Sequence, residues 1–169
     1  MTKKVLLLDS SAVLNDFNFA FKEGCSYATT SQIVWEIRDL RSRSLVESAL
    51  QKQLISVVDP KPETVNWVIK KTSQSGFQRL SSADLSIIAL AVEFKELPQA
   101  YTLMTDDYSI QNFCMLFEIP FEPIIQGRIK KPISFRTVCS NCSKEFSNET
   151  GLKRCDICDS PLKKTRNSP

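Results

Sequence analysis

Acidic residues recur in the first part of the chain where strands are expected to end and helices to begin. They stand in or beside the segments VLLL, SQIVWEI, SSADLSIIALA and AYTLMT, and they are Asp9, Glu36, Asp84, Asp106 and Asp107. Carboxylates brought together repel one another unless cations compensate, and Mg²⁺ or Mn²⁺ prefers oxygen ligands of this kind. A metal in such a site activates water and stabilises the leaving oxygen in phosphodiester cleavage. The set therefore points to metal-dependent hydrolysis of a phosphodiester.

Each acid also has an ordinary explanation. Asp9 can cap a helix that begins at Ser10, Asp84 can extend a cap formed by Ser81 or Ser82, and Glu36 can be solvated. The hypothesis depends on the whole set. The chain has no histidine, no glycine-rich phosphate loop and no serine-centred triad that would supply a competing chemistry.

Four cysteines near the C-terminal end form two pairs, Cys139-x2-Cys142 and Cys155-x2-Cys158, separated by twelve residues. Two such pairs complete a tetrahedral sulfur shell around Zn²⁺. A segment of about 30 residues is too small to form a stable hydrophobic core and needs a cross-link such as a metal ion or disulfides. Two disulfides are the alternative, which a cytosolic setting disfavours. We expect one structural zinc per chain, and we expect Cys25 and Cys114 to be inert core residues.

Charge is unevenly distributed although the net charge is only +3. Residues 1–125 carry 12 Lys and Arg against 15 Asp and Glu, whereas residues 126–169 carry 10 against 4. The basic segment is either a solvated surface or a contact for a polyanion such as RNA. Its candidate RNA-binding residues are Arg128, Lys130, Lys131, Arg136, Lys153 and Arg154.

The first 125 residues alternate between strand and helix patterns. Strands are expected at 5–8, 26–29, 54–58, 101–105 and 121–125, and helices from Ser31 to about Ala49, from Pro62, from Ala83 to about Phe94, and from Asp107 to Leu116. This alternation predicts an α/β domain of three layers with a mainly parallel sheet of about five strands. Sites in such sheets form at the carboxyl ends of strands, where Asp9 and the Asp106–Asp107 pair stand.

The expected organisation is a nuclease-like domain over 1–126, a linker over 127–134, a zinc ribbon over 135–163 and a basic tail over 164–169. No apolar run approaches the length of a membrane span, and the apolar start is too short for a signal peptide. We therefore expect a cytoplasmic protein without a membrane partner.

The segments LLLDSSAVL, TSQIVWEIRD, LSSADLSIIALA and LMTDDYSIQNFC resemble the successive acidic motifs of PIN-domain nucleases. With a four-cysteine ribbon after them, the chain resembles the NOB family, endonucleases that mature the 3′ end of small-subunit ribosomal RNA. Its compact length resembles the archaeal members.

The resemblance implies a catalytic Mg²⁺ or Mn²⁺ site, a structural Zn²⁺ site, and precursor small-subunit rRNA or the pre-small ribosomal subunit, with its assembly factors, as partner. It assigns the catalytic metal to Asp9, Glu36, Asp84 and one of Asp106 and Asp107, and it leaves open which of the two. Ser10 and Thr105 resemble the hydroxyl residues that line PIN sites.

Other functions stay open at this point. A toxin-like PIN ribonuclease would cut tRNA or mRNA, but such proteins are usually shorter and lack a zinc ribbon. A non-catalytic rRNA-binding assembly factor would carry vestigial acids, which the intact acid set argues against. A zinc-ribbon transcription factor is disfavoured because the ribbon is the smaller part.

Overall fold

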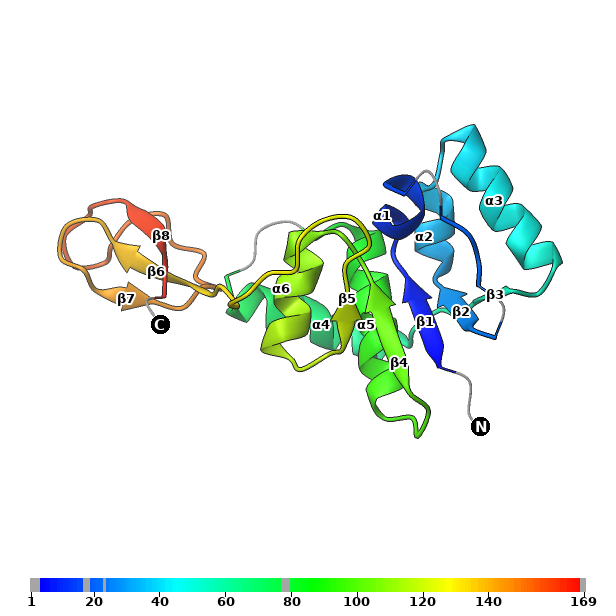
Figure 1. The fold of residues 1–169 in the computed structure, drawn as a ribbon. Coiled ribbons are helices and arrows are strands. Elements are labelled where there is room, and N and C mark those ends of the chain that lie inside the picture. Colours follow the sequence, from blue (N-terminus) through cyan, green and yellow to red (C-terminus); the bar gives the residue numbers. More distant parts are fainter. Residues whose placement is uncertain (1–3, 17–18, 23, 77–79, 168–169) are drawn as a thin grey trace.

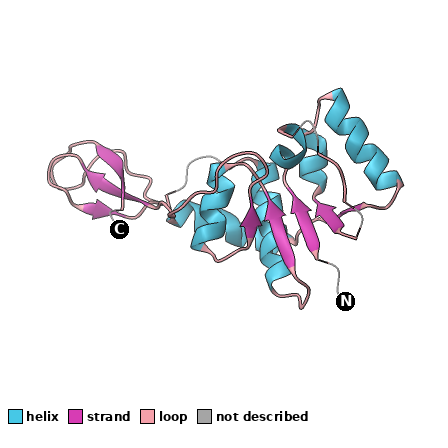
Figure 2. Cartoon of the chain, in the orientation of Figure 1, coloured by secondary structure: helices cyan, strands magenta, loops and turns pink. Residues whose placement is uncertain are grey.

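The computed structural model of the chain describes residues 4–16, 19–22, 24–76 and 80–167. A larger part with a five-stranded sheet and flanking helices is joined by an extended segment to a smaller part with three strands (Figure 1). Helices occur only in the larger part of the described chain (Figure 2).

The five strands of the larger part are short and all parallel to their neighbours. Their order in the sheet is β3-β2-β1-β4-β5. They are β1 (Val5–Leu8), β2 (Ser26–Thr29), β3 (Ile55–Val57), β4 (Tyr101–Met104) and β5 (Phe121–Glu122). The expected α/β architecture with a mainly parallel five-stranded sheet is confirmed.

Six helices connect or follow these strands. They are α1 (Ser10–Leu14), α2 (Ser31–Glu36), α3 (Leu40–Gln51), α4 (Pro62–Gln74), α5 (Ser82–Lys95) and α6 (Tyr108–Leu116). Helix α5 packs against β1 and β4. It is apolar on all sides, and Ile87, Ile88 and Leu90 are fully buried, as expected of a helix in the centre of a core. Burial of each such side chain contributes roughly 1.5–3 kcal/mol.

The expected helix from Ser31 to about Ala49 is wrong, because the chain forms two helices there. The backbone at Ile37 is extended, which ends α2. The Asp39 carboxylate then accepts a hydrogen bond from the Ser42 backbone N–H and caps α3. A local cap thus breaks an apolar pattern that continues at helical spacing. The start of α2 at Ser31 agrees with the expected helix start, and Thr30 caps the helix.

The smaller part is an antiparallel sheet of three strands in the order β7-β6-β8. The strands are β6 (Phe135–Cys139), β7 (Glu145–Phe146) and β8 (Leu162–Arg166). The expected ribbon end at residue 163 falls inside β8, whose pairing with β6 continues from Leu162 to Arg166. Residues 164–166 are therefore part of the sheet rather than a basic tail, because Phe135 to Thr137 supply their backbone partners.

The two parts meet where α4 ends and β6 begins. The Phe135 N–H donates to the Ser75 carbonyl at 3.2 Å. The Asn148 side-chain amide donates to the carbonyls of Gln74 at 2.8 Å and Phe135 at 2.6 Å. Gly76 has φ of +73°, and a Cβ there would lie 2.8 Å from the Cβ of Phe135. The close approach therefore depends on glycine.

In the ranges that the structure describes, no helix is long and apolar enough to cross a membrane.

Candidate functional site

The acidic residues lie at the topological switch point of the parallel sheet, between β1 and β4. The chain leads from β1 to β2 on one side, and from β4 to β5 on the other. The carboxyl ends of β1 and β4 therefore border a crevice, the usual binding place in open α/β sheets. Asp9 directly follows β1, and Asp106 and Asp107 lie just beyond β4.

Asp9 is held firmly in this crevice, with only 2% of its surface exposed. Its carboxylate accepts hydrogen bonds from the Ser10 N–H at 2.7 Å, the Ser11 hydroxyl at 2.6 Å and the Thr105 hydroxyl at 2.8 Å. Burial raises the pKa of Asp9. The three hydrogen bonds lower it by a smaller amount, and the charge of Asp84 raises it further. The site thus places a buried carboxylate beside a second one.

Asp84 joins the site from the first turn of α5. Its carboxylate accepts from the Ser81 N–H at 2.7 Å, while the Ser81 hydroxyl accepts from the Asp84 N–H at 3.1 Å, which forms a capping box. Burial raises the pKa of Asp84, hydrogen bonds from Ser81 lower it, and the charges of Asp107 and Glu36 raise it. Asp84 therefore lies within electrostatic reach of three other carboxylates.

Glu36 completes the rim at the end of α2. Its side chain is exposed, and its carboxylate accepts from the Ser10 hydroxyl at 3.1 Å. Since Ser10 follows Asp9, this bond ties the end of α2 to the end of β1. Glu36 is thus not merely a solvated side chain.

Asp106 and Asp107 have different surroundings although they are neighbours in sequence. The Asp106 carboxylate is 3% exposed and accepts from the backbone N–H groups of Ile124, Ile125 and Gln126 at 2.8 to 3.3 Å. Burial favours a higher pKa for Asp106, but these donors outweigh it and lower the pKa. Asp106 is thus engaged by the loop after β5 rather than by the other acids.

Asp107 caps α6 with one carboxylate oxygen, which accepts from the Ser109 N–H at 2.6 Å and the Ile110 N–H at 3.2 Å. It is also the member of the pair whose charge acts on Asp84. Asp107 is therefore within electrostatic reach of Asp84.

The donor set of this crevice fits a hard divalent cation, because it consists of carboxylate and hydroxyl oxygens. In the described ranges, only the cysteine group brings three or more ligand atoms within 4.8 Å of one another. The carboxylates thus stand further apart than in a closed cage. A cation held here would complete its coordination with water, as Mg²⁺ commonly does.

The four cysteines of the smaller part converge, with all four sulfur atoms within 4.8 Å. The Cys139 and Cys158 sulfurs are 3.4 Å apart, and those of Cys142 and Cys155 are 3.6 Å apart. Tetrahedral Zn–S bonds of about 2.3 Å place sulfurs about 3.8 Å apart. All four are free thiols rather than disulfides. The group fits one zinc ion.

Both cysteine turns have the same backbone form. Ser143 and Asp159, which follow the second cysteine of each pair, have φ of 59° and 55°. Backbone N–H groups two residues after the first cysteine donate to its sulfur at 3.4 Å in both turns. Such donors stabilise thiolates. Hydrogen bonds from Ser160 lower the pKa of the Cys158 thiol to about 6.

The six predicted RNA-binding cations differ in their surroundings. Arg136 pairs with Glu145, and Arg154 pairs with Asp159 at 2.9 Å. Arg128 lies over the ring of Phe121 at 4.7 Å. In the described part of the chain, the remaining three make no ion pair, and they are Lys130, Lys131 and Lys153.

Sequence reasoning missed two exposed aromatic side chains beside the acids. Trp35 precedes Glu36 and is 83% exposed, and Tyr108 follows Asp107 and is 52% exposed. The signal for Trp35 was available, since Ile33 and Ile37 mark the buried face of α2 and leave Trp35 outside it. Lys164 was missed too, and its ammonium group donates to the Gly76 carbonyl at 3.3 Å.

A groove of about 520 Å³ separates the two parts beside α6. Tyr108, Lys131 and Lys164 are among the residues that line it. It extends from the start of α6, directly after Asp107, to the first and last strands of the ribbon.

Known proteins resemble this chain over most of its length. The model of the PIN domain of ribonuclease matches residues 6–94, which include Asp9, Glu36 and Asp84. The chain is 34% identical over 165 residues to Endoribonuclease Nob1 of Methanothermobacter thermautotrophicus, a match that covers 97% of this chain and 93% of the relative. It is 33% identical to Endoribonuclease Nob1 of Pyrococcus abyssi, over 96% of this chain and 94% of the relative.

A differently named relative is also similar. Ribonuclease VapC1 of Thermoplasma acidophilum is 29% identical over 161 residues, which cover 95% of this chain and 77% of the relative. The two Nob1 relatives exceed it in identity and in the share of their own length that is matched. By its PIN-domain match and by its nearly full-length similarity to these relatives, the chain belongs to the Nob1 family of PIN-domain endoribonucleases.

Proposed function

We propose that the chain is a divalent-metal-dependent endoribonuclease that cuts single-stranded RNA at the 3′ end of precursor small-subunit rRNA during ribosome biogenesis. The observation that carries this proposal is the gathering of four carboxylates from four elements at the switch point of the sheet. Its relatives named Endoribonuclease Nob1 support the reaction class.

In this proposal Asp9, Glu36, Asp84 and Asp107 hold Mg²⁺ or Mn²⁺. The bound metal would supply a water of lowered pKa and would neutralise charge on the phosphate. Asp9 is a fixed anchor, because three hydrogen bonds orient its buried carboxylate. Asp106 has a structural role, since backbone N–H groups occupy its oxygens.

Two hydroxyl residues position these carboxylates. Thr105 donates to Asp9 and accepts from the Asp107 N–H at 3.1 Å. Ser10 donates to Glu36 while its N–H donates to Asp9. Both are therefore positioning residues of the proposed site.

We propose that the RNA reaches these carboxylates from the ribbon, along the groove lined by Tyr108, Lys131 and Lys164. The groove ends beside Asp107, and lysines there would contact phosphates. The exposed Tyr108 ring offers a stacking surface for a base. Zn²⁺ on the four cysteines would hold the ribbon in shape. Because those thiols must stay reduced, we place the protein in the cytoplasm.

The test is incubation of the chain with short RNAs that span the 3′ junction of precursor small-subunit rRNA. Cleavage is expected with Mn²⁺ or Mg²⁺ and not with EDTA. Asp9→Asn and Asp84→Asn should abolish cleavage and leave the fold intact. Equal cleavage by the wild type and both variants would contradict a metal-dependent nuclease.

The similarity to Ribonuclease VapC1 favours a second candidate, a toxin-like ribonuclease that cuts tRNA or mRNA. Because this match also spans most of the chain, the two candidate functions must be distinguished by the RNA substrate that the protein prefers. Faster cleavage of tRNA or mRNA than of the rRNA junction would favour this candidate. Binding of the junction without cleavage in any metal would instead indicate a non-catalytic assembly factor.

A further inference from the structure

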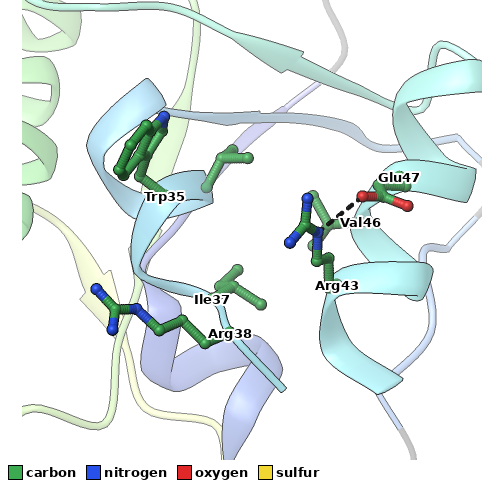
Figure 3. A pocket seen from close by; sticks show the side chains of 7 residues that line it. Trp35, Ile37, Arg38, Arg43, Val46 and Glu47 are labelled. Carbon is green, nitrogen blue, oxygen red and sulfur yellow. Dashed lines mark hydrogen bonds and ion pairs between the residues drawn. The ribbon is translucent and has the colours of Figure 1, made fainter. Parts of the chain in front are cut away.

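A second hollow lies between α2 and α3. The groove beside α6 is on the other side of the carboxylates (Figure 1). Its volume is about 690 Å³. Figure 3 shows Trp35 and Arg38 on the α2 side and Arg43, paired with Glu47, on the α3 side. Its floor is apolar, with the buried side chains of Ile37 and Val46.

Trp35 is presented to solvent by the geometry of its short helix. Ile33 and Ile37 face the core, so the residue midway between them must point outward. Its ring is 83% exposed and contacts no other ring among the residues that the structure describes. Because this exposed side chain also lines the hollow, its ring is available to a ligand there.

The position of this ring connects it to the carboxylates. Glu36, the next residue, accepts from the Ser10 hydroxyl beside Asp9 at 3.1 Å. On the same helix, the Gln32 side chain accepts from the Ser82 hydroxyl at the start of α5 at 3.5 Å. Helix α2 is therefore fixed against the two elements that carry Asp9 and Asp84.

The charges around the ring suit a phosphate. Arg38 is exposed and has no ion pair among the described residues, while Asp39 is occupied by capping α3 and Glu47 by Arg43. A planar guanidinium binds phosphate oxygens in pairs. A flat ring beside a free guanidinium is the combination that binds an unstacked base and its phosphate.

We propose that this hollow binds one nucleotide of single-stranded RNA next to the cleavage site, with Trp35 stacked on the base and Arg38 against the phosphate. The inference rests on the proposed endoribonuclease function. It places contacts on both sides of the carboxylates, so that the strand is held before and beyond the bond that is cut.

Fluorescence gives a direct test, because the chain has only two tryptophans, Trp35 and Trp67. Trp67 lies on α4 against Phe117, so Trp67→Phe leaves Trp35 as the single reporter with little change in packing. In EDTA, a junction RNA should quench this fluorescence in a saturable way. RNA binding detected by anisotropy without any quenching would overturn the proposal and leave the ring to a protein partner.

Affinity and an abasic scan locate the stacked base. Trp35→Ala should weaken RNA binding about 5- to 150-fold, and Trp35→Phe should retain most of it. Removal of single bases from the RNA should reveal one position that weakens binding to the wild type but not to Trp35→Ala. A position-independent loss, or equal losses in both proteins, would contradict stacking at Trp35.

Arg38→Ala should flatten the slope of log K against log salt by about 0.7 for one lost phosphate contact. Lys52→Ala is the matched control, since Lys52 is an exposed cation at the far end of α3. Equal slopes for both variants would contradict a phosphate contact at Arg38.

The wild type separates this inference from the proposed function. If it neither binds nor cuts the junction RNA, both fall. If it cuts that RNA and Trp35→Ala has unchanged affinity, only the nucleotide site falls.

Discussion

The Thr105 hydroxyl, just after β4, donates to the Asp9 carboxylate, just after β1, at 2.8 Å. The same hydroxyl accepts from the Asp107 N–H at 3.1 Å. One side chain thus sets the spacing of two proposed metal ligands that are 98 residues apart in sequence.

Thr105→Val should therefore impair cleavage although its shape is nearly unchanged. It removes a donor to a buried carboxylate, which costs about 1–3 kcal/mol of stability and raises the pKa of Asp9 further. Thermal unfolding and cleavage at a series of Mn²⁺ concentrations measure the two effects. Thr105→Ser should restore both, and a fully active Thr105→Val variant would show that this hydroxyl positions nothing.

Asp106→Asn and Asp107→Asn should have opposite consequences. Asp106→Asn weakens charge-assisted bonds from three backbone N–H groups and should lower the free energy of unfolding by about 1–3 kcal/mol. Asp107→Asn retains a good helix cap but removes a charge near Asp84, so it should abolish cleavage with little change in stability. Denaturant unfolding and cleavage assays on both variants check this. The reverse pattern would assign the metal to Asp106.

The metal-free protein should lose stability as pH rises because of Asp84. Its pKa in the folded protein is raised above the ordinary value of 3.8. The folded state therefore binds more protons than the unfolded state between the two values, and stability falls as pH rises through the folded pKa. Asp84→Asn should reduce that fall. Unfolding midpoints in EDTA from pH 3 upward, for wild type and variant, measure it, and parallel curves would contradict the shift.

Zinc removal should unfold the smaller part and leave the larger one folded. Among its described residues, the ribbon buries few side chains apart from cysteines. Metal binding must therefore supply the stability that a hydrophobic core would otherwise give. Elemental analysis should find one zinc per chain, lost in Cys139→Ser or Cys158→Ser. Hydrogen exchange should then increase from about residue 135 onward. A zinc-free chain with an ordered ribbon would disprove the metal assignment.

The salt dependence of RNA binding should separate free lysines from paired arginines. Lys131→Ala should flatten the slope of log K against log salt by about 0.7, whereas Arg136→Ala should change it less, because Glu145 already neutralises Arg136. Removal of residues 127–169 should weaken binding much more than either. If a 1–126 fragment bound and cut the junction RNA equally well, the basic segment would be only a solvated surface.

Local signals made much of the fold predictable. Each of the five expected strand segments contains a strand of the parallel sheet, and Ser81, Pro62 and Asp107 marked helix starts. The break between α2 and α3 was not predictable from periodicity, because apolar residues continue at helical spacing across Asp39.

The site was less predictable where partners are distant in sequence. The distinction between Asp106 and Asp107 depends on N–H groups at 124–126, and the loss of Arg136 as a free cation depends on Glu145 across the sheet. Neither partner is visible from the motif that contains the residue. The exposure of Trp35, by contrast, was missed although the spacing of Ile33 and Ile37 could have predicted it.

Asn148 stands between the two cysteine pairs in the sequence, and its side-chain amide donates both to the end of α4 and to the first ribbon strand. The loop that zinc would order therefore also fixes the direction in which the ribbon points. If the ribbon binds RNA at one place and cleavage occurs at the carboxylates, the length of RNA between the two places is constant. The molecule would then act as a ruler that places the cut a set number of nucleotides from the bound element. Loss of the Asn148 hydrogen bonds would make the position of the cut variable rather than slow the reaction.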